Sequence, residues 1–137
     1  MWFDIDQRSS VPIYQQLVEG VKEAVARGVL AVGEKLPSVR ELAARTAVNP
    51  NTIAKAYQEL EREGIIETFR GRGTFVAARK IQVDGEEKKR VIREMLRRVL
   101  VEAYYLDLSQ EELLSLLEEA VREWHREGRG KQCLNGR

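Results

Sequence analysis

Cysteine and histidine are almost missing from this 137-residue sequence, which has one of each. A lone Cys133 forms no disulfide within the chain and indicates a reducing compartment. A lone His125 leaves no histidine cluster to hold a metal. Paired catalytic carboxylates, a nucleophile–base pair and a phosphate-binding loop are also missing. We therefore predict no metal, no cofactor and no enzymatic activity, and we interpret Cys133 and His125 as inert.

Long apolar runs are missing as well. No stretch approaches the roughly 20 residues that a membrane span needs. The N-terminus, MWFDID, carries two aspartates and lacks the apolar core of a signal peptide. Ten glycines and three prolines are too few for a fibrous or low-complexity chain. We expect a soluble, cytoplasmic protein that has no membrane partner.

Acidic residues are absent from two segments, although the chain has 22 acids and a net charge of only +1. The first segment, Leu42–Gln58, contains Arg45 and Lys55, and the second, Thr68–Lys80, contains four basic residues. Such a distribution is typical of a surface that meets an anionic partner.

The first part of the chain predicts one helix and a connector. Trp2–Ile5 alternates apolar and acidic residues, as in a short strand or arm. A helix is predicted from near Pro12, because proline suits a first turn, to Gly28. Val29–Lys35 is then a connector with a turn at Gly33.

Two short capped helices follow. Ser38-Val39-Arg40-Glu41 is a capping box, and the helix that it starts is predicted to end near Arg45 or Thr46. In the second helix, Asn49–Glu63, Asn49 caps and Pro50 occupies the first position. Its inward face is the stripe Ile53, Ala56, Tyr57 and Leu60. Two such helices joined by a few residues form a helix-turn-helix, whose second helix enters the DNA major groove.

A basic hairpin comes next. Ile65–Phe69 and Thr74–Val76 are rich in β-branched and aromatic residues, and Arg70-Gly71-Arg72-Gly73 separates them. An arginine on such a thin ribbon can enter a narrow minor groove, where the negative potential is concentrated. We therefore interpret the hairpin as a second element that contacts DNA.

The outward face of the second helix suits base readout. Asn51 can pair its acceptor and its donor with an adenine edge, Thr52 offers a hydroxyl, and Lys55 supplies a positive charge. The three acids of this helix come only near its end, which we expect to leave the groove.

The C-terminal part predicts two more helices, Glu86–Tyr105 and Ser109–Glu127, after a linker at Lys80–Gly85 and before a polar tail, Gly128–Arg137. A two-helix hairpin is too small to enclose a typical metabolite pocket of roughly 300 Å³. Its apolar stripe exceeds what one partner helix covers, so we predict burial in a dimer. The predicted dimerisation residues are Val91, Met95, Leu96, Val99, Leu100, Tyr104, Leu113, Leu117 and Trp124.

The segments LPSVRELA, AVNPNTIAKAYQELEREGIIE and RGRGTFV together resemble the winged helix-turn-helix of the GntR family of bacterial transcription regulators. PIYQQL and VNPNTIAKAY are similar to its YtrA subfamily. The resemblance covers roughly residues 3–78. It implies a mainly α fold with a small β-hairpin, a DNA-binding winged helix-turn-helix over residues 1–78, and a two-helix dimerisation domain over 79–137. The implied function is a sequence-specific DNA-binding regulator, expected to be a repressor that acts as a homodimer on a pseudo-palindromic operator.

The resemblance also assigns residues. Arg40 corresponds to the DNA-contacting arginine of the first capped helix, Asn51 and Thr52 to the polar pair that opens the recognition helix, and Arg70 and Gly71 to the wing tip. Many members carry arginine where this chain has Pro50 and Ala54, so base readout here rests on other side chains, with Asn49, Asn51 and Lys55 as candidates. The full predicted DNA-binding set is Ser38, Arg40, Asn49, Asn51, Thr52, Lys55, Arg70, Gly71, Arg72 and Thr74.

The same residues are also compatible with purely structural roles. Asn51 and Lys55 are also compatible with a solvated helix surface, the two wing arginines with an ordinary turn, and Arg40 with a salt bridge to Glu41 or Glu34. Asn49 fits a cap better than a base reader, and Tyr57 fits the core. The alternative function is a winged-helix protein-binding adaptor without specific DNA binding. The operator, the regulated genes and any small-molecule effector are not specified by the sequence.

Overall fold

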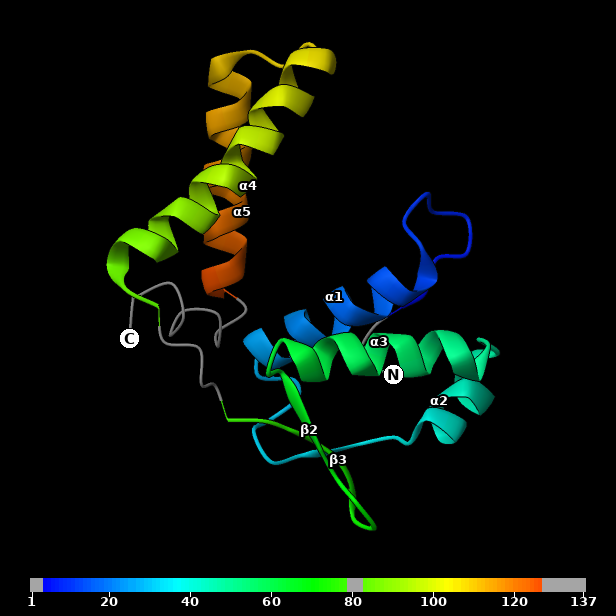
Figure 1. Ribbon diagram of the computed structural model, residues 1–137. Helices are drawn as coiled ribbons and strands as arrows, with labels where there is room; N and C mark the ends of the chain where they lie inside the picture. The colour runs from blue at the N-terminus through cyan, green and yellow to red at the C-terminus, as the bar shows by residue number, and fades with distance from the viewer. Residues whose placement is uncertain (1–3, 79–82, 127–137) are drawn as a thin grey trace. The chain divides into compact units, whose positions relative to one another are not determined.

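The computed structural model describes residues 4–78 and 83–126, which fall into two compact units (Figure 1). The fold is mainly helical with one small antiparallel sheet, and the predicted fold class is confirmed. The elements of the first unit are α1 (Ile13–Ala26), β1 (Lys35–Leu36), α2 (Val39–Thr46), α3 (Pro50–Arg62), β2 (Ile66–Phe69) and β3 (Gly73–Val76). Those of the second are α4 (Gly85–Tyr105) and α5 (Gln110–Arg126).

The segment before α1 is held by a side chain and forms no strand over Asp4–Asp6. Gln16 accepts a hydrogen bond from the Asp6 N–H at 2.8 Å and donates to the carbonyls of Asp6 and Val11, both at 2.9 Å. Ile5 packs against the core. Of the two forms predicted for Trp2–Ile5, a strand or an arm, the strand is wrong for Asp4 and Ile5, and residues 1–3 lie outside the described part.

The caps that the sequence predicts at α2 and α3 are confirmed. The Glu41 N–H donates to Ser38 Oγ at 3.0 Å, and the Ser38 N–H donates to the Glu41 carboxylate at 3.4 Å. At α3 the Asn51 N–H donates to Asn49 Oδ1 at 2.8 Å, with Pro50 at the first helical position. Local hydrogen-bonding groups in the sequence therefore determine where both helices begin.

The sheet has one more strand than the sequence predicted. The strand order is β1-β3-β2, with Lys35 opposite Phe75 and Leu36 opposite Thr74. The prediction of Lys35 as part of a connector was wrong, because this pairing spans about 40 residues and β1 is too short to show a two-residue period. Leu36 is buried and anchors β1 to the core.

The core of the first unit lies between α1, α3 and the inner face of the sheet. The predicted inward stripe of α3 is buried throughout, and the Tyr57 hydroxyl donates to the Pro37 carbonyl at 2.7 Å. Burial raises the pKa of Tyr57 to about 12, and the nearby Glu41 carboxylate adds to the effect. Tyr57 thus ties α3 to the segment that leads into α2.

The second unit is a pair of helices with very little core of its own. α4 begins at Gly85, inside the predicted linker, because Asp84 accepts a hydrogen bond from the Glu87 N–H at 2.8 Å. Ser109 accepts from the Glu112 N–H at 3.1 Å and so starts α5 as predicted. Ala103 is the one buried residue in the described part of this unit. The predicted tail Gly128–Arg137 lies outside the described residues.

Candidate nucleic-acid interface

The first two turns of α3 present polar side chains to solvent. Asn49, Asn51 and Lys55 are exposed and Thr52 is half-buried, while the opposite face of the helix is in the core. Figure 1 shows α3 beside α1, with α2 close to the beginning of α3. The N–H groups of Asn51, Thr52 and Ile53 are all hydrogen-bonded to Asn49. The positive end of the helix dipole lies at this start of α3, which favours an anionic ligand.

The side-chain oxygens of Ser38 and Asn49 accept the cap hydrogen bonds of α2 and α3, so each residue already uses one acceptor within the fold. Arg40 is exposed at the start of α2. The alternative salt bridge from Arg40 does not form within residues 4–78 and 83–126. Its two expected partners bond elsewhere, Glu41 to the Ser38 N–H and Glu34 to the Ala31 N–H at 3.1 Å.

Lys55 is exposed, yet its ammonium has a defined neighbour on another helix. Its Nζ lies 4.2 Å from the centre of the Tyr14 ring, which α1 supplies. Tyr14 is half-buried and packs against the hydrophobic core. The cation is therefore held over a fixed aromatic surface.

The tip of the wing between β2 and β3 is a tight glycine turn. The Arg72 N–H donates to the Phe69 carbonyl at 2.9 Å, and Gly71 has a φ of 79°, which the third position of a type II turn requires. Arg70 and Arg72 are exposed, and within the described residues neither forms an ion pair. Thr74 is half-buried on β3 and its hydroxyl oxygen lies 3.3 Å from that of Thr68.

Two residues of this surface were missed by the sequence analysis. Lys35 extends along the wing from β1, and its Cε lies 2.7 Å from where a Cβ on Gly73 would be. Tyr14 lies beneath Lys55. The charge of Lys35 was the one available signal, because both placements depend on contacts between segments far apart in the chain.

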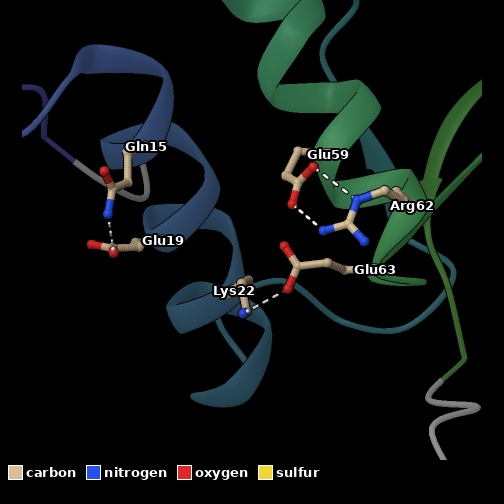
Figure 2. A network of polar contacts seen from close by, with 6 residues as sticks. All are labelled: Gln15, Glu19, Lys22, Glu59, Arg62 and Glu63. Carbon is tan, nitrogen blue, oxygen red and sulfur yellow. Dashed lines mark hydrogen bonds and ion pairs between the residues drawn. The ribbon is translucent and has the colours of Figure 1, made fainter. Parts of the chain in front are cut away.

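Three carboxylates lie at the C-terminal end of α3, two in the helix and one on its cap residue Glu63, and ion pairs occupy two of the three (Figure 2). Arg62 hydrogen-bonds Glu59 and lowers its pKa, and Glu63 meets Lys22 of α1 at 3.0 Å. On α1 itself, the Gln15 amide donates to Glu19 at 3.3 Å. Pairing of this kind reduces the negative field that α3 presents beyond its first turns.

The second unit exposes most of its large apolar side chains. Leu100 is 58% exposed and Tyr104 is 78% exposed. Of the other predicted dimerisation residues, Leu113 and Trp124 are half-buried. The rest are exposed: Val91, Met95, Leu96, Val99 and Leu117.

No helix in residues 4–78 and 83–126 is long and apolar enough to cross a membrane. The same residues contain no cluster of three His, Cys, Asp or Glu side chains suited to a metal.

Known proteins are similar to this chain in sequence and in fold. The profile of a family described as "Bacterial regulatory proteins, gntR family" matches residues 13–76. The HTH-type transcriptional repressor YtrA of Bacillus subtilis is 47% identical over 115 residues, which cover 84% of this chain and 88% of YtrA.

Two solved structures are similar to the fold. A structure titled as a transcriptional antiterminator from Listeria monocytogenes EGD-e superposes with a TM-score of 0.77 at 42% identity, covering 88% of this chain and 90% of its own. The DNA-binding domain of AraR, solved in complex with operator ORX1, gives a TM-score of 0.51 at 27% identity, covering 56% of this chain and 99% of its own.

The fold and the exposed polar face of α3 define a winged helix-turn-helix transcription regulator that binds DNA. The chain belongs to the GntR family and is similar over most of its length to the repressor YtrA. The resemblance that the sequence motifs indicated is confirmed.

Proposed function

We propose that the protein is a sequence-specific repressor that binds a two-fold operator as a homodimer, with α3 in the major groove and the wing in the adjacent minor groove. The observation that carries this proposal is the first two turns of α3, where Asn49, Asn51 and Lys55 are exposed around a helix N-terminus. Asn51 reads a base, because its amide can bond two atoms of one adenine edge.

The wing supplies a second contact. Arg70 and Arg72 flank Gly71, which keeps the tip thin, and no acidic partner within the described residues neutralises them. A guanidinium on a narrow ribbon fits the minor groove, where the negative potential is strongest. Lys35 extends the same positive surface along β1 and is suited to backbone phosphate.

Dimerisation is supported by the second unit. Its described residues expose a large set of apolar side chains and bury only Ala103, an arrangement that is costly for a monomer in water. A second copy covers the same face by two-fold symmetry and doubles the number of DNA contacts. The contact residues are those predicted from the sequence, centred on Leu96 and Leu100.

Repression is supported by the relative YtrA, which is named a transcriptional repressor, and operator binding by the AraR domain solved with its operator. A bound dimer of this kind blocks polymerase sterically. Because the ligand is operator DNA, we place the protein in the cytoplasm.

Fluorescence anisotropy with labelled duplex DNA at two salt concentrations tests the proposal. The DNA-binding function requires affinity to fall steeply with salt, since each neutralised phosphate releases counterions. Specific sites should bind with a Kd of order 10⁻⁸ M or tighter. Absence of salt-sensitive duplex binding would reject this function in favour of a protein-binding adaptor.

Selection of bound fragments from random duplex DNA tests specificity and symmetry together. A two-fold consensus is expected, because two recognition helices read related half-sites one helical turn apart, about 10 base pairs. A consensus without symmetry would contradict the dimer while leaving DNA binding intact.

A further inference from the structure

We infer that Tyr14 and Lys55 form a phosphate-binding pair that spans α1 and α3, with Lys55 contacting the DNA backbone and Tyr14 holding it in place. This inference rests on the proposed placement of α3 against DNA. It assigns a role to Tyr14, for which no local sequence pattern is a signal, and it gives Lys55 a contact with the backbone in place of a base.

The position of the ammonium is the first argument. Lys55 Nζ lies 4.2 Å from the centre of the Tyr14 ring, so the side chain leans from α3 toward α1. A base reader in the major groove has to extend toward the groove floor, as the first turn of α3 does. Attraction to the ring instead holds this cation to one side of that turn, where a groove-bound helix is flanked by the sugar-phosphate backbone.

The rigidity of the ring is the second argument. Tyr14 packs against the hydrophobic core and is half-buried, whereas Lys55 is exposed. The aromatic face is therefore a fixed support, and the ammonium above it remains open to a ligand. A lysine whose side chain is already held in place loses less conformational entropy when it binds a ligand. The effect on affinity is favourable because the lysine side chain is flexible.

The hydroxyl of Tyr14 is the third argument. Within the described residues this hydroxyl forms no hydrogen bond, and its oxygen is accessible to solvent beside the Lys55 side chain. A phosphate group accepts several hydrogen bonds, and an ammonium with a hydroxyl supplies two donors of suitable kind. The pair therefore has the chemistry to hold one phosphate from two helices.

A test separates a phosphate contact from a base contact. Lys55→Gln is expected to weaken binding to the operator and to unrelated duplexes by the same factor, and to reduce the salt slope of log K by about one per protomer. Lys88→Gln, an exposed lysine of α4, serves as the matched control and should leave the slope unchanged. A change in the preferred base at one operator position in Lys55→Gln would overturn the inference.

Tyr14 is tested by two variants and a double-mutant cycle. Tyr14→Leu removes the ring face and should weaken binding to every duplex about two- to five-fold, the range for an exposed cation–π pair. Tyr14→Phe keeps the ring and should restore the part of the loss that depends on Lys55. Circular dichroism of each variant shows whether the fold is retained.

The cycle gives the decisive result. If Tyr14 acts through Lys55, then Tyr14→Leu costs less in the Lys55→Gln background than in the wild type. Equal costs in both backgrounds would reject the pair. A wild-type protein that binds no duplex at all would reject the proposed function itself, so the two failures are distinguishable.

Discussion

At the scale of single residues, Asn49 and Asn51 are two positions apart and have different roles. The Asn49 oxygen is committed to the cap of α3, whereas within the described residues the Asn51 side chain is free for a ligand. Residue type alone does not distinguish them, because both asparagines suit a cap and a base edge equally well. Their positions relative to the first helical turn make the distinction.

Asn51→Ala is expected to cost about 1–3 kcal/mol at one base pair of the operator and to relax the preference there, because one bidentate contact is lost. Competition binding against operators altered at single positions measures this effect. Equal loss on every sequence would contradict the assigned role.

Asn49→Ala is expected to reduce the free energy of unfolding by about 1 kcal/mol, since the Asn51 N–H loses its acceptor. Urea denaturation measures the change, and Asn49→Ser, which keeps a capping oxygen, is the matched control. A stability equal to wild type would indicate that the cap contributes nothing.

Tyr57 gives the fold a defined response to alkaline pH. Its pKa lies at about 12 in the folded protein against 10.0 ordinarily, so the unfolded chain loses this proton first as the pH rises. The stabilisation from Tyr57 is therefore complete below pH 10 and is lost between pH 10 and about 12. We expect the unfolding free energy to fall more steeply above pH 10 in the wild type than in Tyr57→Phe, as measured in urea at pH 8 and pH 11. Tyr105→Phe, at an exposed position, should behave as the wild type does.

At the scale of elements, the proposed complex divides affinity and specificity between the wing and α3. The wing carries charge on a turn held by Gly71, with few polar groups that distinguish bases. α3 carries the amide and hydroxyl groups that do. Ion pairs at the far end of α3 occupy Glu59 and the cap residue Glu63, which reduces their repulsion of DNA in the proposed complex (Figure 2).

Arg70→Ala is expected to weaken binding to all sequences, or chiefly to sites with narrow flanking minor grooves, and to lower the salt slope. Anisotropy titrations against operators with A-tract and mixed flanks measure both effects. Arg122→Ala, an exposed arginine of α5, is the matched control. Loss confined to one base pair within the α3 half-site would contradict the role of the wing.

At the scale of the whole molecule, the second unit is the part whose apolar side chains do not bury one another. The described part of its two helices buries only Ala103, and in the proposed dimer a second copy covers the exposed apolar side chains. A dimeric regulator of this kind couples its affinity for DNA to its own concentration.

Leu100→Glu is expected to produce a monomer and to abolish tight operator binding, because a charge would be buried in the dimer contact. Leu100 is 58% exposed in the single chain, so the folded monomer does not depend on it. Sedimentation analysis measures the oligomeric state. Tyr105→Glu adds the same charge on another face of α4 and is expected to leave the dimer intact. A dimeric Leu100→Glu protein would contradict the proposed contact face.

The sequence by itself determined the helix starts at Ser38 and Asn49, the buried stripe of α3 and the glycine turn of the wing, because each depends on groups within a few residues. The tertiary structure alone decided the third strand at Lys35–Leu36 and the position of Lys55 over Tyr14. Both join segments about 40 residues apart, and no local pattern encodes which distant partner a strand edge or a lysine will meet.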